Sequence, residues 1–400
     1  MIGLIDADGF FASCELSRSP HLRGKPVMVL GRIGSFVLAK TQEAKLRGVT
    51  TVMPYWEAKK RCPDGIFLEG DFKFYTLMSR RLMAILKTWS PTVQVSSIDE
   101  AYMDLSGIEK MHKKTFLEVG DAIRSDVWQQ LGITVTVGIS ANKVLAKMAC
   151  EAKKPNGTVV LKANDIMDFL MSVEVGKIPG IGRQRLKSIQ HYGIHSAKDL
   201  AKLPMTLIKQ LFGKNGIMLW RELHGDYMFR VDSTPRVPKQ IGRTSSLPRP
   251  SNDMRIIEGL SFYHLERSIE SLHQHDLAAG EFRLYLRDQE FKSLYLKSAL
   301  TEATDDFVTL AGCLKQLIAK IPPGRYWRSA GILLVDLRSS RIKQLSLFEG
   351  VLPVLQKERL NKAKDDLNKR FGQFTVSSAS HLFFKKEKKK DDDRRLGIFL

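Results

Sequence analysis

The stretch "SSIDEAYMDLSG", residues 96–107, sets two adjacent carboxylates, Asp99 and Glu100, among strand-forming residues. A third carboxylate, Asp104, follows close behind. Adjacent like charges repel, and a half-buried strand seldom carries them without a counter-charge. The pattern therefore raises the question of which cation, if any, lies beside these carboxylates.

The first strand of the chain ends in "DADGFFA", residues 6–12. Asp6 and Asp8 are two residues apart, so in an extended strand their side chains point the same way. A single Asp at a strand end commonly caps the following helix. Asp6 combined with Asp99 and Glu100 on a neighbouring strand would instead form an oxygen-rich site for two hard divalent cations. The residues leave one alternative open, which is a carboxylate pair neutralised by nearby lysines.

Composition points to an anionic partner. The 400 residues are enough for two to four domains, and the formal net charge of +20 favours nucleic acid or an anionic membrane over a merely basic surface. No apolar run approaches the roughly 20 residues needed to span a bilayer, and Asp6 and Asp8 interrupt the N-terminus before a signal-peptide core could form. We therefore expect a cytoplasmic protein that binds nucleic acid and no membrane. The cysteines are scattered without metal or redox spacing, so we expect them in the core: Cys14, Cys62, Cys150 and Cys313.

The chain falls into three parts by pattern. Strands separated by helices predict an α/β or α+β domain over the first 165 residues. Short helices broken by glycine follow from about 165 to 230, and then comes a linker rich in proline and charge. Residues 241–340 predict the order β-α-β-β-α-β, with apolar Phe282 and Leu284 alternating with Arg283 and Arg287 along one strand. That alternation predicts one sheet face covered by helices and one free basic face.

Five blocks of sequence occur in the order seen in Y-family translesion DNA polymerases, which the chain resembles over at least residues 1–340. The first two of these blocks are most similar to the catalytic subunit of bacterial polymerase V, and the block ending "KKPNG" is more similar to polymerase IV. The blocks are "IDADGFFASCE" (5–15), "LAKTQEAKLRGV" (38–49), "SSIDEAYMDLSG" (96–107), "GISANKVLAKMACEAKKPNG" (138–157) and "IPGIG" (178–182).

The resemblance implies an α+β right-hand polymerase fold with a C-terminal little-finger domain. The implied parts are a palm (1–164) with a fingers insertion (about 17–76), a helix-hairpin-helix thumb (165–232), a linker (233–240), a little finger of β-α-β-β-α-β order (241–340) and a tail (341–400).

The resemblance also implies the catalytic site. Asp6, Asp99 and Glu100 match the catalytic metal ligands, and the backbone carbonyl of Ala7 would add one more oxygen. They would hold two Mg²⁺ ions that align a primer 3′-hydroxyl with the α-phosphate of an incoming dNTP. Asp8 and Asp104 match nearby acidic positions with support roles only.

The nucleotide-binding positions follow from the same resemblance. Phe11 matches the steric gate, an aromatic ring that would collide with a ribonucleotide 2′-hydroxyl, and Phe10 precedes it with core packing as the alternative role. Lys45 and Lys154 match positions that contact the triphosphate, with Lys40 a weaker candidate. The chain departs from the polymerase IV pattern at Ala39, Gln42 and Lys45, and a lysine gives a point charge where an arginine would give a bidentate fork. These departures put tight nucleotide binding in doubt.

The DNA and partner contacts complete the implied site. Gly180 and Gly182 of "IPGIG" would let backbone N–H groups approach a DNA phosphate. The basic face of the little finger would follow the duplex backbone, with Arg243, Arg283, Arg287 and Lys297 as candidates. The peptide "QLSLF" resembles a sliding-clamp-binding motif through Gln344, Leu345, Leu347 and Phe348, and the terminal "RLGIFL" could be a second contact.

The resulting hypothesis is a template-directed, low-fidelity DNA polymerase that copies damaged templates in DNA repair and the SOS response to DNA damage. One alternative is a non-catalytic relative that serves as a clamp-linked scaffold, and another is a helix-hairpin-helix DNA-binding module without chemistry. The intact set of Asp6, Asp99 and Glu100 argues against both. The sequence leaves open which lesions are bypassed and whether accessory SOS subunits are needed.

Overall fold

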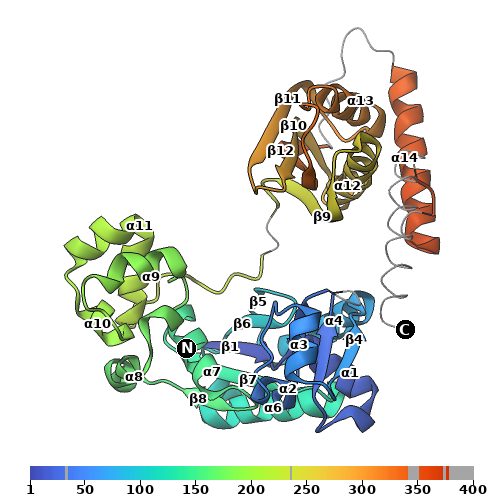
Figure 1. Ribbon diagram of the computed structural model, residues 1–400. Coiled ribbons are helices and arrows are strands. Elements are labelled where there is room, and N and C mark those ends of the chain that lie inside the picture. The colour runs from blue at the N-terminus through green and yellow to red at the C-terminus, as the bar shows by residue number, and fades with distance from the viewer. Residues whose placement is uncertain (32–34, 235–236, 341–350, 373–374, 378–400) are drawn as a thin grey trace. The chain divides into compact units, whose positions relative to one another are not determined.

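The computed structural model describes residues 1–31, 35–234, 237–340, 351–372 and 375–377. The chain forms two compact units, Met1–Thr234 and Pro235–Leu400. Figure 1 shows the strands and helices of each unit.

The first unit is built around a five-stranded sheet with the order β5-β6-β1-β7-β8. Its strands are antiparallel except for β7 and β8, which run parallel. Alternation places Ile5 and Ala7 on the face packed against α4 and α6, while Leu4 and Asp6 lie on the face that carries α7. The elements are β1 (Ile2–Ala7), β5 (Val93–Val95), β6 (Glu100–Asp104), β7 (Val135–Ser140), β8 (Thr158–Val160), α1 (Phe10–Arg18), α4 (Phe72–Trp89), α5 (Ile108–His112), α6 (Phe116–Leu131) and α7 (Lys143–Lys153).

The helices of the palm have clear local causes. Asp71 caps α4 through the Phe74 N–H, and Thr115 and Glu118 form a capping box at the start of α6. Asn142 caps α7 through the Leu145 N–H, so α7 begins directly after β7 and returns across the sheet. Gly138 of β7 makes this crossing close, because a Cβ there would lie 2.2 Å from the Ala146 carbonyl oxygen of α7.

The fingers segment has its own small sheet, in the order β3-β2-β4. It encloses a separate core that includes Met28, Val37, Met53 and Cys62. The elements are β2 (Val27–Leu30), β3 (Val37–Lys40), β4 (Ile66–Glu69), α2 (Gln42–Leu46), α3 (Tyr55–Arg61) and the short 3₁₀ turn η1 (Pro20–Leu22).

The thumb is helical and shares a core with the C-terminal side of the palm. Ile178 and Ile181 anchor the "IPGIG" turn in that core, and Gly180 adopts a positive φ of 90° that suits the third position of a type II turn after proline. The elements are α8 (Ile166–Ser172), α9 (Arg183–Gln190), α10 (Ala197–Lys202), α11 (Met205–Leu223) and the 3₁₀ turns η2 (Ala163–Asp165) and η3 (Val175–Lys177).

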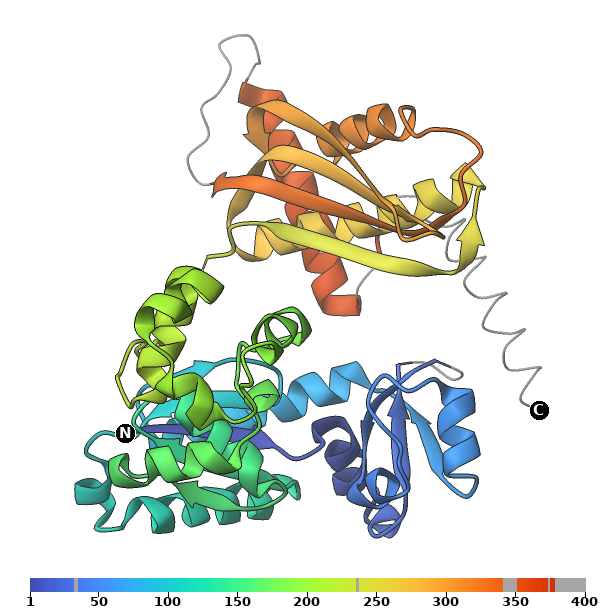
Figure 2. The ribbon, with the colours of Figure 1, turned by 60° about the vertical axis from the view of Figure 1, so that its left-hand side comes forward.

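The second unit has the predicted order β-α-β-β-α-β, arranged as a sheet β11-β10-β12-β9. The two helices pack on the apolar face of the sheet, behind the strands in Figure 2. The elements are β9 (Ile241–Ser251), α12 (Met254–Gln274), β10 (Leu277–Asp288), β11 (Ser293–Thr304), α13 (Phe307–Ile318) and β12 (Trp327–Ser339).

A further helix, α14 (Val351–Phe371), lies within the segment that the sequence analysis treated only as a tail. Lys364 of α14 lies 3.6 Å from Glu266 of α12 and 5.1 Å from the ring centroid of Phe307 on α13. Leu360 and Phe371 remain 71% and 61% exposed, so the described part of α14 contributes little to the apolar core.

The structure also bears on two expectations from the sequence, the location of the cysteines and the membrane. Cys14, Cys62 and Cys150 are buried and Cys313 is half-buried against the core of the second unit, all as free thiols. Among the described residues, no helix combines the length and apolar character required to cross a membrane.

Candidate active site

The register of the palm sheet brings two of the predicted carboxylates together. Asp6 of β1 lies directly opposite Glu100 of β6, and both side chains are on the sheet face that carries α7. Asp104 pairs with Ile2 at the far end of β6, where its carboxylate accepts the Ser106 N–H at 2.9 Å. The first strand and the "SSIDEAYMDLSG" stretch are therefore neighbours, as the sequence predicted.

Asp99 lies in the turn between β5 and β6 rather than in a strand. Its backbone carbonyl accepts the Ala7 N–H at 3.0 Å, which ties the turn to the end of β1. The Ser97 hydroxyl donates to the Asp99 carboxylate and also accepts the Glu100 N–H at 3.1 Å. Ser97 thus fixes the backbone that presents both carboxylates, and the Ser96 hydroxyl donates to Glu100 Oε1 at 2.8 Å.

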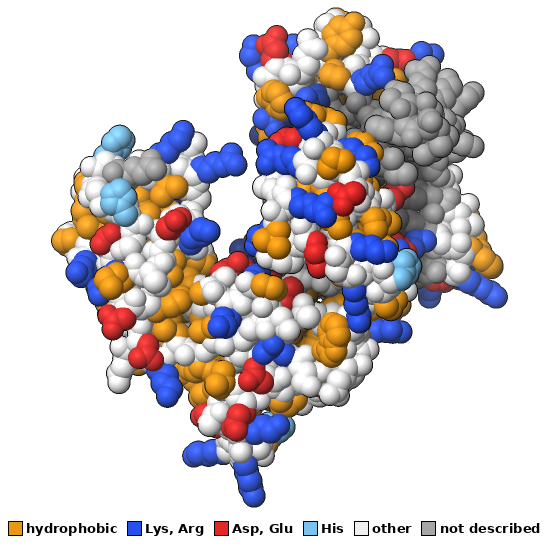
Figure 3. All heavy atoms as spheres, turned by 60° about the horizontal axis from the view of Figure 1, so that its bottom comes forward, with side chains coloured by type: hydrophobic (Ala, Val, Ile, Leu, Met, Phe, Trp, Pro, Cys, Tyr) orange, Lys and Arg blue, Asp and Glu red, His pale blue; other side chains and the backbone are white. Residues whose placement is uncertain are grey.

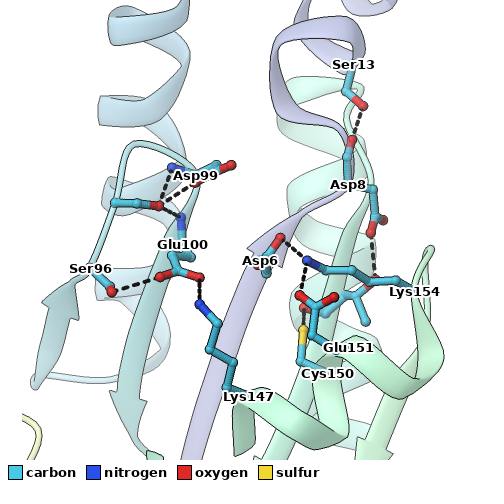
Figure 4. Close-up of polar contacts among 12 residues, drawn as sticks. Asp6, Asp8, Ser13, Ser96, Asp99, Glu100, Lys147, Cys150, Glu151 and Lys154 are labelled. Atoms are coloured by element: carbon cyan, nitrogen blue, oxygen red, sulfur yellow. Dashed lines mark hydrogen bonds and ion pairs between the residues drawn. The ribbon is translucent and has the colours of Figure 1, made fainter. Parts of the chain in front are cut away.

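Two lysines from α7 and its C-terminal end neutralise the carboxylates (Figure 4). Lys154 Nζ lies 2.8 Å from Asp6 Oδ1 and 2.6 Å from Glu151 Oε1. Lys147 Nζ lies 2.8 Å from Glu100 Oε2. The lysine-neutralised alternative that the residues left open is therefore present in this structure. Sequence reasoning missed Lys147, although its spacing of seven residues from Lys154 places both on one side of a helix.

The pKa values reflect this arrangement. Burial raises the pKa of Asp6 to about 6, against the opposing effect of Lys154. Burial also acts to raise the pKa of Glu100, but the hydrogen bonds from Lys147 and Ser96 outweigh it and leave that pKa below its ordinary value. Burial acts to lower the pKa of Lys154, and the contacts with Asp6 and Glu151 reverse this effect and raise it.

The side chains of this site offer the type of ligand atom that a divalent cation binds. Within the described part of the chain, no three or more acidic, histidine or cysteine side chains are already gathered as a metal site. Asp6 and Glu100 are nevertheless cross-strand partners, the Asp99 backbone is bonded to Ala7, and all three carboxylates supply the oxygen ligands that Mg²⁺ prefers. In this structure the two lysines supply the positive charge beside Asp6 and Glu100.

Asp8 has a different task from Asp6. One of its carboxylate oxygens accepts the Thr136 hydroxyl at 2.7 Å, and the other accepts the Asn156 backbone N–H at 2.9 Å. Asn156 follows Lys154 in the loop between α7 and β8, so Asp8 anchors the loop that carries this lysine.

The two phenylalanines of "DGFFA" differ in environment. Phe10 is 3% exposed and belongs to the palm core, so the structure favours its packing role. Phe11 is only partly buried and contacts the aromatic rings of Phe72 and Tyr75 on α4. Of the pair, Phe11 alone presents a ring that a nucleotide could reach.

The fingers contribute cations near one another. Lys45 is exposed on α2. Burial lowers the pKa of Lys40, and the nearby charge of Lys45 lowers it further. Lys40 Nζ also donates to Thr51 Oγ1 at 3.0 Å. Gln42, the first residue of α2, is exposed. Two neighbouring lysines with this surface position suit an anion such as a triphosphate.

The thumb turn is open to a ligand on one side. A Cβ added at Gly182 would meet no atom within 4 Å, whereas the carbonyl of Gly180 accepts a hydrogen bond from Arg185 Nη1 at 2.8 Å. Gly182 also precedes α9, whose first residues include the exposed Arg183 and the half-buried Arg185.

The exposed sheet face of the second unit carries most of the basic residues that were predicted to contact DNA. Arg283 lies opposite Lys297 in the register of β10 and β11, and Tyr285 lies opposite Tyr295 with ring centroids 5.1 Å apart. Arg287 lies on the same strand face, with its guanidinium 5.0 Å from the ring centroid of Phe291. Lysine and arginine side chains are also spread over the face of both units shown in Figure 3.

Arg243 does not belong to that exposed face, which corrects the sequence-based expectation. Its register partner is Ile332, a core residue, and its Nη2 donates to Ser271 Oγ of α12 at 2.9 Å. Its neighbours Gly242 and Thr244 are exposed, whereas Arg243 between them is half-buried. Alternation therefore directs Arg243 toward the helices.

The predicted clamp-binding residues 344–348 and the terminal "RLGIFL" lie outside the described residues.

Comparison with known proteins agrees with this geometry. The model of the impB/mucB/samB family matches residues 5–151, and the model of that family's C-terminal domain matches residues 238–347. DNA polymerase IV 1 of Bacillus subtilis is 31% identical over 385 residues, covering 94% of this chain and 92% of the relative. DNA polymerase IV of Pelotomaculum thermopropionicum is 33% identical, covering 95% of this chain and 94% of the relative.

Solved structures show the same likeness. A Y-family DNA polymerase chimera of Dbh and Dpo4 matches with a TM-score of 0.70 and 25% identity, covering 85% of this chain and all of that one. A structure titled as the insertion ternary complex of Dbh DNA polymerase matches with a TM-score of 0.60 over the same shares and at the same identity. Fold and matches together define a DNA-directed DNA polymerase of the right-hand class with a little-finger domain. Within that class, the chain belongs to the impB/mucB/samB family of Y-family translesion polymerases.

Proposed function

We propose that this polymerase extends a DNA primer past damaged template bases with low fidelity, using dNTPs and two Mg²⁺ ions. The observation that carries the proposal is the pairing of Asp6 with Glu100 across β1 and β6, with Asp99 bonded to the same strand end. Asp6, Asp99, Glu100 and the Ala7 carbonyl would hold the ions. When bound, two such ions activate an attacking hydroxyl and stabilise a leaving pyrophosphate.

The chain's own residues would bind and select the substrate. Lys154, held beside Asp6 by its loop, and Lys45 on α2 would bind the triphosphate. The Asp6 carboxylate and the triphosphate would compete for the single ammonium group of Lys154. With divalent ions neutralising Asp6, Lys154 would be free to contact the phosphates instead. Phe11 would act as the steric gate against the 2′-hydroxyl. These roles rest on the geometry above and on the resemblance to the family.

Low fidelity follows from the size of the fingers. Their core is a separate cluster of a few side chains on a three-stranded sheet, which gives a small cover over a nascent base pair. A small cover would test base-pair shape weakly and tolerate a distorted template base.

Primer extension tests the catalytic proposal. Purified wild type should extend a primer on undamaged and abasic templates in Mg²⁺, and Asp99→Ala combined with Glu100→Ala should abolish extension while DNA binding persists. A wild-type protein that binds primer-template normally and extends none of it would instead favour the non-catalytic scaffold. Assaying the chain alone also shows whether accessory subunits are required.

A bacterial sliding clamp is the proposed protein partner, through Gln344, Leu345, Leu347 and Phe348. Alanine at positions 344, 347 and 348 should remove stimulation by the clamp and spare basal extension. Equal loss of both activities would assign the peptide to folding instead. We expect the polymerase to work in the cytoplasm, where bacterial DNA lies.

A further inference from the structure

One face of α1 carries three side chains that meet the first turn of α4. Phe11, Glu15 and Arg18 follow one another at spacings of four and three residues, which places them on one side of the helix. They face Phe72 and Tyr75, at the start of α4.

The ring of Phe11 is held by these aromatic neighbours. Tyr75 stacks on it with centroids 4.6 Å apart and planes inclined by 17°, and Phe72 contacts it edge-on at 5.8 Å. Tyr75 is fully buried, whereas Phe72 is 47% exposed. The position of the Phe11 ring therefore follows the position of the Tyr75 ring.

Tyr75 is fixed in turn by a buried carboxylate. Its hydroxyl donates to Glu15 Oε1 at 2.6 Å, and Glu15 is only 3% exposed. Arg18 binds both oxygens of that carboxylate, with Nε at 2.8 Å from Oε2 and Nη2 at 3.0 Å from Oε1. Arg18 Nη1 also reaches Asp71, the N-cap of α4, at 3.1 Å.

Packing alone does not require this arrangement. A buried carboxylate is costly, and an apolar residue at position 15 would fill the same space between α1 and α4. A hydrogen bond to the Tyr75 hydroxyl is directional, so it restricts the tilt and rotation of that ring in a way that apolar packing does not. Burial, and secondarily Glu15, raise the pKa of Tyr75, which keeps the hydroxyl a neutral donor.

We propose that Glu15 is a positioning residue for Phe11, acting through Tyr75, and that it sets how strongly the site rejects ribonucleotides. The proposal rests on the steric-gate role given to Phe11 above. A gate excludes a 2′-hydroxyl by collision, so a small displacement of its ring changes the exclusion of ribonucleotides more than the binding of deoxyribonucleotides.

The test compares kcat/KM for single-nucleotide insertion of a dNTP and of the matching rNTP by the full chain. A variant that only loses folded enzyme lowers both kcat/KM values equally, so the ratio of the dNTP value to the rNTP value stays unchanged. A change in this discrimination ratio therefore reports on the gate and not on folding. Tyr75→Phe removes only the hydroxyl, Glu15→Leu removes the acceptor, and Glu15→Gln restores an acceptor. Phe11→Ala reports on the gate itself. Asp126→Asn is the matched control, because Asp126 accepts the Trp89 indole N–H at 3.0 Å at the opposite end of α4.

Tyr75→Phe and Glu15→Leu should each lower the discrimination ratio about 2- to 10-fold, the range expected for loss of one net hydrogen bond. The change should appear in the KM for the rNTP, and Glu15→Gln should retain most of the wild-type ratio. If Phe11→Ala admits ribonucleotides while Tyr75→Phe and Glu15→Leu keep the wild-type ratio, the positioning role is overturned and the gate stands. An unchanged ratio in Phe11→Ala would remove the gate and this role together, and a lowered ratio in Asp126→Asn would make the effect non-specific.

Discussion

Lys147 neutralises the Glu100 carboxylate in this structure, where a bound divalent ion would otherwise do so. Its ammonium lies 2.8 Å from the carboxylate proposed as a metal ligand, so it would compete with a metal ion for that carboxylate and repel the ion. The same contact relieves the repulsion among neighbouring acidic groups in the metal-free protein. Lys147 should therefore weaken metal binding and stabilise the metal-free protein.

Lys147→Met should tighten Mn²⁺ binding about fivefold, because loss of a partly exposed ion pair is worth about 1 kcal/mol. Thermal stability without metal should fall. Both are measured by calorimetric titration and thermal unfolding, with Lys153→Met, an exposed lysine of the same helix, as the charge-matched control. Weaker Mn²⁺ binding in Lys147→Met would instead show that the lysine supports the metal-bound arrangement.

Glu222 is a buried acid at the contact between thumb and palm. It is 2% exposed, its Oε1 has no hydrogen-bond partner among the described residues, and burial raises its pKa to about 7 despite Lys143. The folded chain therefore binds more protons than the unfolded chain between about pH 4.5 and 7, and stability falls as the pH rises through that window.

Glu222→Gln should remove this dependence and stabilise the first unit at pH 8 by about 1–3 kcal/mol, since one pKa unit corresponds to about 1.4 kcal/mol. Urea unfolding at pH 5.5 and pH 8 measures both effects. Glu69→Gln, at an exposed residue, removes the same charge and should leave the pH dependence unchanged. A variant less stable than wild type at pH 8 would mean that the ionised carboxylate has a favourable role.

At the scale of elements, α7 is the part that positions both lysines, and its distance from the sheet is set at Gly138. A Cβ at this residue would lie 2.2 Å from the Ala146 carbonyl and 2.4 Å from the Cys150 nitrogen, which are both backbone atoms of α7. Neither can move without moving the helix.

Gly138→Ala should therefore destabilise the first unit by about 2–3 kcal/mol, as overpacking against backbone does, and should reduce primer extension further by displacing Lys147 and Lys154. Gly312→Ala on α13 is the opposite control. Its Cβ would meet no atom within 4 Å, so it should stabilise the second unit by about 0.5–1 kcal/mol. Urea unfolding reports both signs, and a neutral Gly138→Ala would contradict the close crossing.

The elements that the sequence predicted well have strong periodicity. The order β-α-β-β-α-β and the two faces of β10 could be read because Phe282, Leu284 and Leu286 alternate with larger polar residues. The face of Arg243 could not be read, because Gly242 and Thr244 beside it mark neither face. Helix α14 was missed because its residues were assigned, with the rest of 341–400, to a tail.

The site shows the same limit. Asp6, Asp99 and Glu100 were predicted as metal ligands from the adjacent carboxylates and from the resemblance to the family. The structure places Asp6 opposite Glu100 in one strand register and bonds the Asp99 carbonyl to the Ala7 N–H. The lysine contacts and the link from Glu15 to Tyr75 depend on distances between elements far apart in the chain. Those distances cannot be derived from residue type and spacing along the chain.

At the scale of the whole molecule, the net charge of +20 is distributed over two units. DNA affinity should therefore fall steeply with salt, because binding releases counterions from phosphates. Arg287→Ala combined with Lys297→Ala should lower the slope of log K against log [salt] by about 2, near one for each lost phosphate contact. Arg283 should contribute less, because Glu281 lies 2.5 Å from its Nε and compensates its charge.

Arg243→Met is the control that distinguishes charge lost from the exposed sheet face from charge lost elsewhere in the same unit. It removes one positive charge from the same sheet, but from the side that packs on α12, so the salt slope should stay at the wild-type value while the second unit loses stability. Fluorescence anisotropy with a primer-template duplex over a range of salt concentrations measures the slopes. Equal slopes for wild type and the Arg287 and Lys297 variant would place the DNA elsewhere. A reduced slope in Arg243→Met alone would place it on the helical side of the sheet.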